Sequence, residues 1–107
     1  MRVIYNRFFP FRGFVAINLF GVIFARREYR PVSDKTLRHE QIHTAQMRET
    51  AYLFFYLIYL FEYLYLLVRL RHFRDAYRAI RFEREAYRYA SEPDYLKKRK
   101  PFQWCYL

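Results

Sequence analysis

The order of apolar and polar positions divides the chain into a strand-rich beginning and a long helical remainder. Residues 3–27 are rich in β-branched and aromatic side chains and include both glycines, which is typical of short strands separated by turns. Residues 33–92 contain neither glycine nor proline, a stretch too long for one helix in a small domain. The pattern predicts a mostly helical α+β fold, with short antiparallel strands followed by three or four helices.

The first helix is expected to begin at Ser33. Pro31 disfavours helical backbone in the residue before it. Ser33 is suited to the N-cap, and Asp34 adds negative charge to the first turn, where the helix dipole favours it. This start places the sequence "HEQIH", residues 39–43, in the second and third turns.

The "HEQIH" sequence has the spacing of a metal site. His39 and His43 are four residues apart, so on a helix they differ by about 40° and share one face. Two such imidazoles supply part of a zinc ligand set, and Glu40 lies where it can accept a proton from zinc-bound water. The opposite side carries Arg38, Gln41, Thr44 and Arg48, which suits solvent. The same pattern also arises by chance in proteins without metal, so it does not establish a zinc site by itself. Such a site needs at least one further protein ligand.

The helix expected over residues 71–90 offers that third ligand. Four further arginines lie within about 60° of Arg74 at 100° per residue, forming a basic stripe that includes Glu85 as an exposed ion-pair partner. Glu83 lies about 180° away among inward-facing apolar residues, where a carboxylate is costly unless paired or metal-bound. Helical phase therefore selects Glu83 over Glu85. The alternative for Glu83 is a buried ion pair with Arg48 or a hydrogen bond to a tyrosine.

"HEQIH" followed about 40 residues later by "FEREAY" resembles the gluzincin zinc metallopeptidases, above all the small single-domain minigluzincins. Their pattern is HExxH on one helix and Glu-x-x-Ala on a later one, which residues 83–86 match. The resemblance implies a zincin-like fold and Zn²⁺ bound by His39, His43 and Glu83. It implies peptide-bond hydrolysis by zinc-activated water, with Glu40 as general base.

The resemblance departs at Tyr87, where some gluzincins have an aspartate that supports a ligand histidine. A tyrosine or Glu62 could supply that support instead. The tetrahedral oxyanion of such a reaction also needs a donor besides zinc. The candidates are His72, Tyr77 and Tyr87, with Tyr87 first because its spacing from Glu83 places both on one helix face.

Residues 51–68 are eighteen mostly apolar positions with one charge, Glu62. A helix of this length rises about 27 Å, just short of a typical hydrocarbon core. Five tyrosines and Glu62 are unfavourable at mid-depth in a bilayer. The alternatives are a buried core or partner-contacting helix, peripheral contact with an anionic membrane surface, and a true span. A homodimer formed through this segment would bury its apolar surface.

The formal net charge is +10, from 20 Lys and Arg against 10 Asp and Glu. Such a charge attracts nucleic acid, anionic lipid or acidic partners, but no RNA- or DNA-reading motif accompanies it, so nucleic acid is not an expected partner. The lone cysteine, Cys105, excludes an internal disulfide framework and fits a reducing compartment. We expect a cytoplasmic protein, membrane-associated if residues 51–68 contact lipid.

These expectations combine into a single domain over residues 1–107. Its parts are a strand region in residues 1–32, a helical region with the zinc site in 33–92, and a basic aromatic tail in 93–107. The resemblance implies that the strand at residues 16–24 pairs with a peptide or flexible protein segment as substrate. The alternatives are a latent or catalytically silent zinc scaffold, its cleft filled by the tail and Cys105 near the metal, and a basic peripheral membrane or partner-binding protein.

Overall fold

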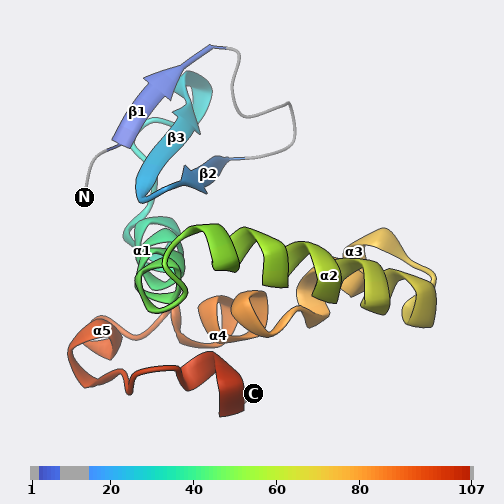
Figure 1. Cartoon of the computed structure of the whole chain (residues 1–107). Coiled ribbons are helices and arrows are strands. Elements are labelled where there is room, and N and C mark those ends of the chain that lie inside the picture. Colours follow the sequence, from blue (N-terminus) through green and yellow to red (C-terminus); the bar gives the residue numbers. More distant parts are fainter. Residues whose placement is uncertain (1–2, 8–14, 107) are drawn as a thin grey trace.

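The computed structural model describes residues 3–7 and 15–106, and its α+β architecture is the predicted one (Figure 1). The strands are β1 (Val3–Asn6), β2 (Ala16–Leu19) and β3 (Val22–Arg26). The helices are α1 (Asp34–Glu49), α2 (Leu53–Leu70), α3 (Phe73–Ala79), α4 (Arg81–Tyr89) and α5 (Tyr95–Lys98), with 3₁₀ turns at Arg27–Tyr29 and Gln103–Tyr106. The helical region is therefore interrupted at more places than its sequence predicts.

The sheet has the order β1-β3-β2, with β2 at one edge. β2 and β3 are antiparallel as expected, joined by a tight turn in which Phe20 (φ 52°) and Gly21 (φ 91°) both have positive φ. β1 instead runs parallel to β3. β2 runs in the direction opposite to β1. β3 runs in the same direction as β1 and lies between the other two strands. Gly13, the other glycine of this region, lies outside the described residues.

Helix α1 begins as predicted, with the Ser33 hydroxyl accepting the backbone N–H of Thr36 at 3.1 Å. The sheet is fastened to this helix by the buried side chain of Asn18. Its amide nitrogen donates to the backbone carbonyl of Glu40 and to the hydroxyl of Thr44, both at 2.8 Å. The expectation that Thr44 faces solvent is therefore wrong. The same contacts hold β2 alongside the helix that carries the two histidines.

Helix α2 lies above α4 in the view of Figure 1, and Phe55 is its one buried residue among those described. The possibility that residues 51–68 form a buried core helix is therefore wrong. One side of α2 packs towards α1, α3 and α4, and its outer side is exposed. In the described part of the chain, α2 is the helix long and apolar enough to cross a membrane by length and composition. The partner-contact and membrane alternatives stay open.

The helix expected over residues 71–90 is interrupted at Ile80, which has an extended backbone (φ −59°, ψ 133°). The chain restarts as α4 because the Glu62 carboxylate accepts the Arg81 N–H at 2.7 Å and pairs with its guanidinium. Helical phase counted from Arg74 does not continue across this break. Glu83 is buried as predicted, but Glu85, expected in an exposed stripe, is 0 % exposed.

The C-terminal segment explains how both sides of α4 are covered. Figure 1 shows it on the side of α4 opposite α2. Trp104 is buried against Phe82, with ring centroids 4.6 Å apart, so the aromatic tail docks on the core through this residue. Phe102, two residues earlier, remains 47 % exposed. Because α4 lies between α2 and this segment, it has two buried faces.

Candidate metal centre

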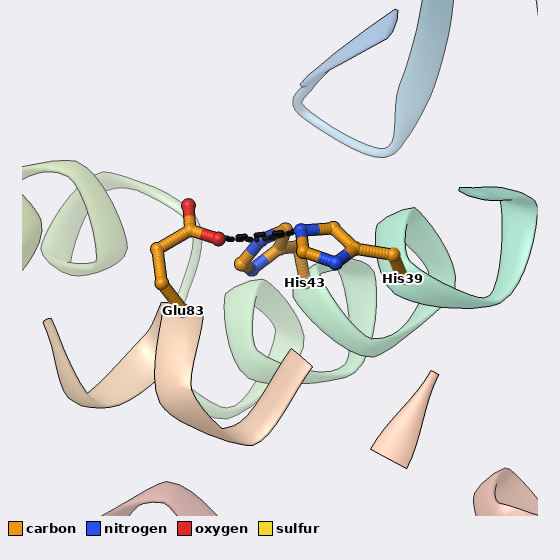
Figure 2. Close-up of side chains that lie close together, drawn as sticks. All are labelled: His39, His43 and Glu83. Atoms are coloured by element: carbon orange, nitrogen blue, oxygen red, sulfur yellow. Dashed lines mark hydrogen bonds and ion pairs between the residues drawn. The ribbon is translucent and has the colours of Figure 1, made fainter. Parts of the chain in front are cut away.

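Three side chains converge between α1 and α4 (Figure 2). The Nε2 atoms of His39 and His43 lie 3.2 Å apart, and Glu83 Oε1 lies 3.2 Å from the first and 3.0 Å from the second. His39, His43 and Glu83 thus form a group that could hold a metal ion. Two imidazole nitrogens and a carboxylate oxygen suit several first-row transition metals. The predicted ligand residues are brought together, and Glu85 lies outside the group.

The Glu83 carboxylate is buried and is paired with the two histidines. Burial favours a neutral Glu83, but the two histidines hold the pKa of that carboxyl far below its usual range. Burial also lowers the pKa of His43, yet the charge and hydrogen bond of Glu83 outweigh it and raise that pKa to about 9. A proton on His43 thus compensates Glu83 in the metal-free protein, in the place that a metal ion would take.

Gln46 orients His43. Its Oε1 lies 2.8 Å from His43 Nδ1, while its amide nitrogen donates to the Phe82 carbonyl and to Glu85 Oε1, each at 3.0 Å. Since the nitrogen of this amide donates twice, its oxygen accepts, and His43 Nδ1 must carry the hydrogen. That arrangement leaves Nε2 free to bind a metal. The support expected from a tyrosine or Glu62 comes instead from Gln46, one helical turn after His43.

Glu83 is oriented by a residue that the sequence did not identify. The Tyr59 hydroxyl donates to Glu83 Oε2 at 2.7 Å, so the other carboxylate oxygen faces the histidines. Burial and the nearby Glu83 charge raise the pKa of Tyr59, which keeps it a donor. The tyrosine contact anticipated as an alternative role for Glu83 therefore exists together with the histidine contacts. Arg48, the other anticipated partner, is exposed.

A buried charge network continues from Gln46 to the C-terminal segment. Arg99 pairs with Glu49 on α1 through two hydrogen bonds, of 2.8 and 3.0 Å, and with Glu85 on α4. Tyr95 also donates to Glu85, at 2.6 Å. These contacts explain why Glu85 is buried without being a metal ligand. Sequence pattern did not reveal them because Arg99 lies directly after the four-residue helix α5, too short a segment to show a periodic pattern.

Two cavities meet at the metal group, with volumes of about 770 and 340 Å³. His39 and Glu40 line both, so the predicted general base lies beside the predicted ligands and opens on both spaces. Glu40 is only 8 % exposed, and burial raises its pKa against the opposing effect of the two histidines. The edge strand β2, residues Ala16–Leu19, forms a wall of the smaller cavity.

The candidate oxyanion donors are separated by the structure. The Tyr87 ring lies edge-on to His39 with centroids 4.6 Å apart, and its hydroxyl is 3.2 Å from that of Tyr77. Both tyrosines line the larger cavity. His72 instead caps α3, accepting the N–H of Asp75 at the surface. Tyr87 and Tyr77 are therefore brought to the site, and His72 is not.

The tail does not fill the cleft. Neither cavity is lined by a residue of the C-terminal segment described, 93–106. Cys105 is exposed and is not part of the metal group found among the described residues. The alternative in which the tail fills the cleft and Cys105 reaches the metal position is therefore wrong.

Comparison of the chain with protein-family models, curated proteins and solved structures finds no match. The arrangement of His39, His43, Glu83 and Glu40 at two joined cavities is thus the basis on which a function can be assigned.

Proposed function

We propose that this chain is a zinc metallopeptidase of the gluzincin type, which hydrolyses peptide bonds. The observation that carries the proposal is the convergence of His39, His43 and Glu83 on one point, with Glu40 buried beside them at an accessible cavity. Clustered titratable side chains in a cavity are the general mark of a candidate active site.

The donor set and its spacing support zinc. Catalytic zinc sites commonly have three protein ligands, and two histidines with a glutamate is one of the established combinations. With zinc–ligand bonds of about 2.0–2.1 Å in tetrahedral geometry, ligand atoms should lie about 3.3 Å apart. The three distances here are 3.0, 3.2 and 3.2 Å. The ligand atoms therefore need to move by only a few tenths of an ångström.

Zinc at this position would lower the pKa of water and polarise the substrate carbonyl. Glu40 would then accept a proton from this water and return it to the leaving amine. Its raised pKa suits both steps, since burial makes this carboxylate a better base than an exposed one. The hydroxyls of Tyr87 and Tyr77, on the wall of the larger cavity, are the candidate hydrogen-bond donors to the developing oxyanion.

The strand β2 is placed to align an extended peptide. It lies at the edge of the described sheet, and Ala16–Leu19 line the cavity that also contains His43 and Glu83. A peptide can add to such an edge through main-chain hydrogen bonds. Asn18 fixes β2 to α1, so a peptide bound along the strand keeps its register relative to Glu40.

Metal content and cleavage together test the proposal. Protein purified without chelator should contain about one zinc per chain by atomic absorption. The Glu83→Ala variant should lose this metal, and Glu40→Gln should retain it but cleave no fluorogenic peptide. Glu92→Ala, which alters an exposed carboxylate, is the matched control and should behave as the unmodified protein. Equal zinc content in Glu83→Ala and Glu92→Ala contradicts the ligand assignment. Zinc retention without cleavage of any peptide in a diverse library favours the scaffold alternative.

A second candidate function, attachment to an anionic membrane surface, is favoured by the outer face of α2. This face is formed by side chains that are each at least 41 % exposed. They are Leu53, Phe54, Leu57, Leu60, Phe61, Leu64, Tyr65 and Val68. At roughly 200 Å² per fully exposed side chain, the face presents on the order of 1,000 Å² of apolar surface, more than a typical monomer exposes.

The shape and charge of this face suit lipid. Its residues cover an arc of about 140° around the helix, wider than the narrow seam of a two-stranded coiled coil. The arc contains no charged residue, and the exposed Arg69 and Arg71 lie at the C-terminal end of the helix. Glu62, the acidic residue of α2, is turned away and paired with Arg81. An in-plane helix with an apolar face and flanking arginines is the pattern of interfacial membrane binding.

Co-sedimentation with lipid vesicles tests this second function. The protein should pellet with phosphatidylserine-containing vesicles, less so in high salt, and weakly with neutral phosphatidylcholine vesicles. Phe61→Asp should reduce binding strongly, whereas Tyr106→Asp, at an equally exposed aromatic residue of the tail, should not. A lipid-free protein that sediments as a dimer, and as a monomer once Phe61 is replaced, would assign the face to a second copy of the chain instead.

A further inference from the structure

The larger cavity beside the metal group has a chemical character of its own. Its volume of about 770 Å³ is in the range of pockets that enclose a small ligand or a short peptide segment. The wall is dominated by aromatic side chains contributed by three helices. They are Tyr59, Tyr63, Phe73, Tyr77 and Tyr87. The space therefore favours a substrate portion with an apolar body and excludes much of the solvent around it.

Two cations flank this aromatic wall from different elements. Lys35 lies in the first turn of α1, one turn before His39, and Arg74 lies on α3. Both line the cavity, and both are exposed to solvent. Arg78 adds a third positive charge behind the wall, with its guanidinium carbon 3.8 Å from the centre of the Tyr87 ring.

The opposing negative charge is small. Among the described residues that line the cavity, Glu40 is the only acid, and it belongs to the metal centre. Asp34 and Asp75 are sequence neighbours of the two cations but do not line the cavity. A divalent metal ion bound at the adjacent centre would increase the positive potential further. Clefts lined by one sign of charge between low-dielectric walls concentrate ligands of the opposite charge.

We propose that this cavity is a binding subsite for a carboxylate-bearing residue of the peptide substrate, with Lys35 and Arg74 as the specificity-determining cations. The inference rests on the proposed function, because it assigns the substrate class of the same site. An acidic residue places its methylene groups against the tyrosines and its carboxylate between Lys35 and Arg74. The same chemistry is offered by an acidic side chain and by the C-terminal carboxylate of a peptide.

Peptide binding to zinc-loaded Glu40→Gln protein tests the subsite without requiring turnover. Fluorescence anisotropy would compare three labelled peptides of one sequence: a C-terminally amidated form with a central Glu, an amidated form with Gln there, and the Gln form with a free C-terminus. Tighter binding of the first over the second identifies an acidic side chain as the ligand. Tighter binding of the third over the second identifies a terminal carboxylate. For two exposed ion pairs we expect about a three- to ten-fold preference.

Charge reversal at the two cations provides the decisive comparison. Adding both Lys35→Glu and Arg74→Glu to the Glu40→Gln protein should abolish the preference for carboxylate-bearing peptides. A peptide with Lys at the central position should then bind more tightly than the peptide with Gln there. Arg71→Glu is the matched control, because Arg71 is an exposed cation nearby that does not line the cavity. Arg71→Glu with an effect equal to that of Arg74→Glu, or equal affinities for all three peptides, would overturn the proposal.

The outcome can be separated from that of the proposed function. Carboxylate-dependent binding with no cleavage by the unmodified protein supports the subsite and contradicts the peptidase. Cleavage that is indifferent to carboxylates, in peptides otherwise identical, supports the peptidase and contradicts the subsite. Because Lys35 and Arg74 are exposed, their replacement should leave the fold intact, and circular dichroism checks this. Raising the salt concentration on the Glu40→Gln variant gives a second measurement, since a charge-based preference should fade.

Discussion

Removing the Arg99 guanidinium should weaken both the fold and the metal centre. Its side chain is only 6 % exposed and joins Glu49 on α1 to the fully buried Glu85 on α4. The Arg99→Ala variant leaves Glu85 buried without a cation, a change that typically costs about 3–5 kcal/mol. The loss at Glu49 should be smaller because that carboxylate is partly exposed. Against a typical total stability of about 5–15 kcal/mol, we expect a protein that still folds but is strongly destabilised.

The Arg99→Ala substitution should also lower the metal affinity, because its effect is passed to His43 through Gln46. Glu85 Oε1 accepts both from Arg99 and from the Gln46 amide, whose oxygen holds His43 Nδ1. Without the guanidinium, the Glu85 carboxylate loses the donors that fix its position, and the Gln46 amide loses its fixed orientation. Disturbing such a support of a ligand histidine commonly reduces metal affinity about 10- to 100-fold.

Urea unfolding and zinc titration measure the two effects separately. Unfolding of metal-free Arg99→Ala should give a lower midpoint, and titration of the folded variant against a competing chelator should give weaker zinc affinity. Lys98→Ala changes an exposed cation of the same segment and should shift stability by no more than about 0.5 kcal/mol. Arg99→Ala within about 1 kcal/mol of that control, or with unchanged zinc affinity, would refute the connection between the C-terminal segment and His43.

Three further predictions concern the metal centre. Gln46→Leu should lower zinc affinity about 10- to 100-fold and alter the visible absorption spectrum of the cobalt-substituted protein, because His43 loses the acceptor at Nδ1; an unchanged cobalt spectrum would contradict this. The chelator-treated protein should be most stable below about pH 6.5 and lose stability as the pH rises through about 9, because folding raises the pKa of His43 to about 9; urea midpoints that are flat over that interval count against the buried His43–Glu83 pair. Asn18→Ala should lower peptidase kcat/KM more than zinc content, because it releases β2 from α1 without touching a ligand; equal kcat/KM would show that the strand needs no such anchor.

Sequence pattern was most informative where one residue determines its local geometry. Ser33 capped the helix as predicted, and that start sets the rotation at which His39 and His43 turn inward. Glu83 was selected over Glu85 by helical phase counted from Arg74, and the break at Ile80 interrupts that phase. The prediction that Glu83 is buried is confirmed, although the argument that separated it from Glu85 is wrong. The cap at Ser33 depends on local sequence alone, whereas the choice of Glu83 was also supported by the match of residues 83–86 to the Glu-x-x-Ala pattern.

The remaining errors come from contacts between segments distant in the chain. The break at Ile80 is stabilised by Glu62, which accepts the N–H of Arg81 at the start of α4. Since the helical phase restarts there, the angle that placed Glu85 beside Arg74 had no meaning in the folded protein. Glu85 is buried because Arg99 reaches it from the tail, and no local pattern announces that contact.

This small chain holds two buried carboxylates by using both sides of α4. Glu83 and Glu85 are two residues apart, so they point in roughly opposite directions from the helix. The first is compensated by the histidines of α1 and the second by Arg99 of the tail. The charge that compensates Glu83 can be a proton on His43, whose pKa the carboxylate raises to about 9. A metal ion that replaced this proton would stabilise the folded state by mass action. Metal binding would then be coupled to folding through Glu83, whereas the contacts of Glu85 with Arg99 and Tyr95 do not involve the metal position.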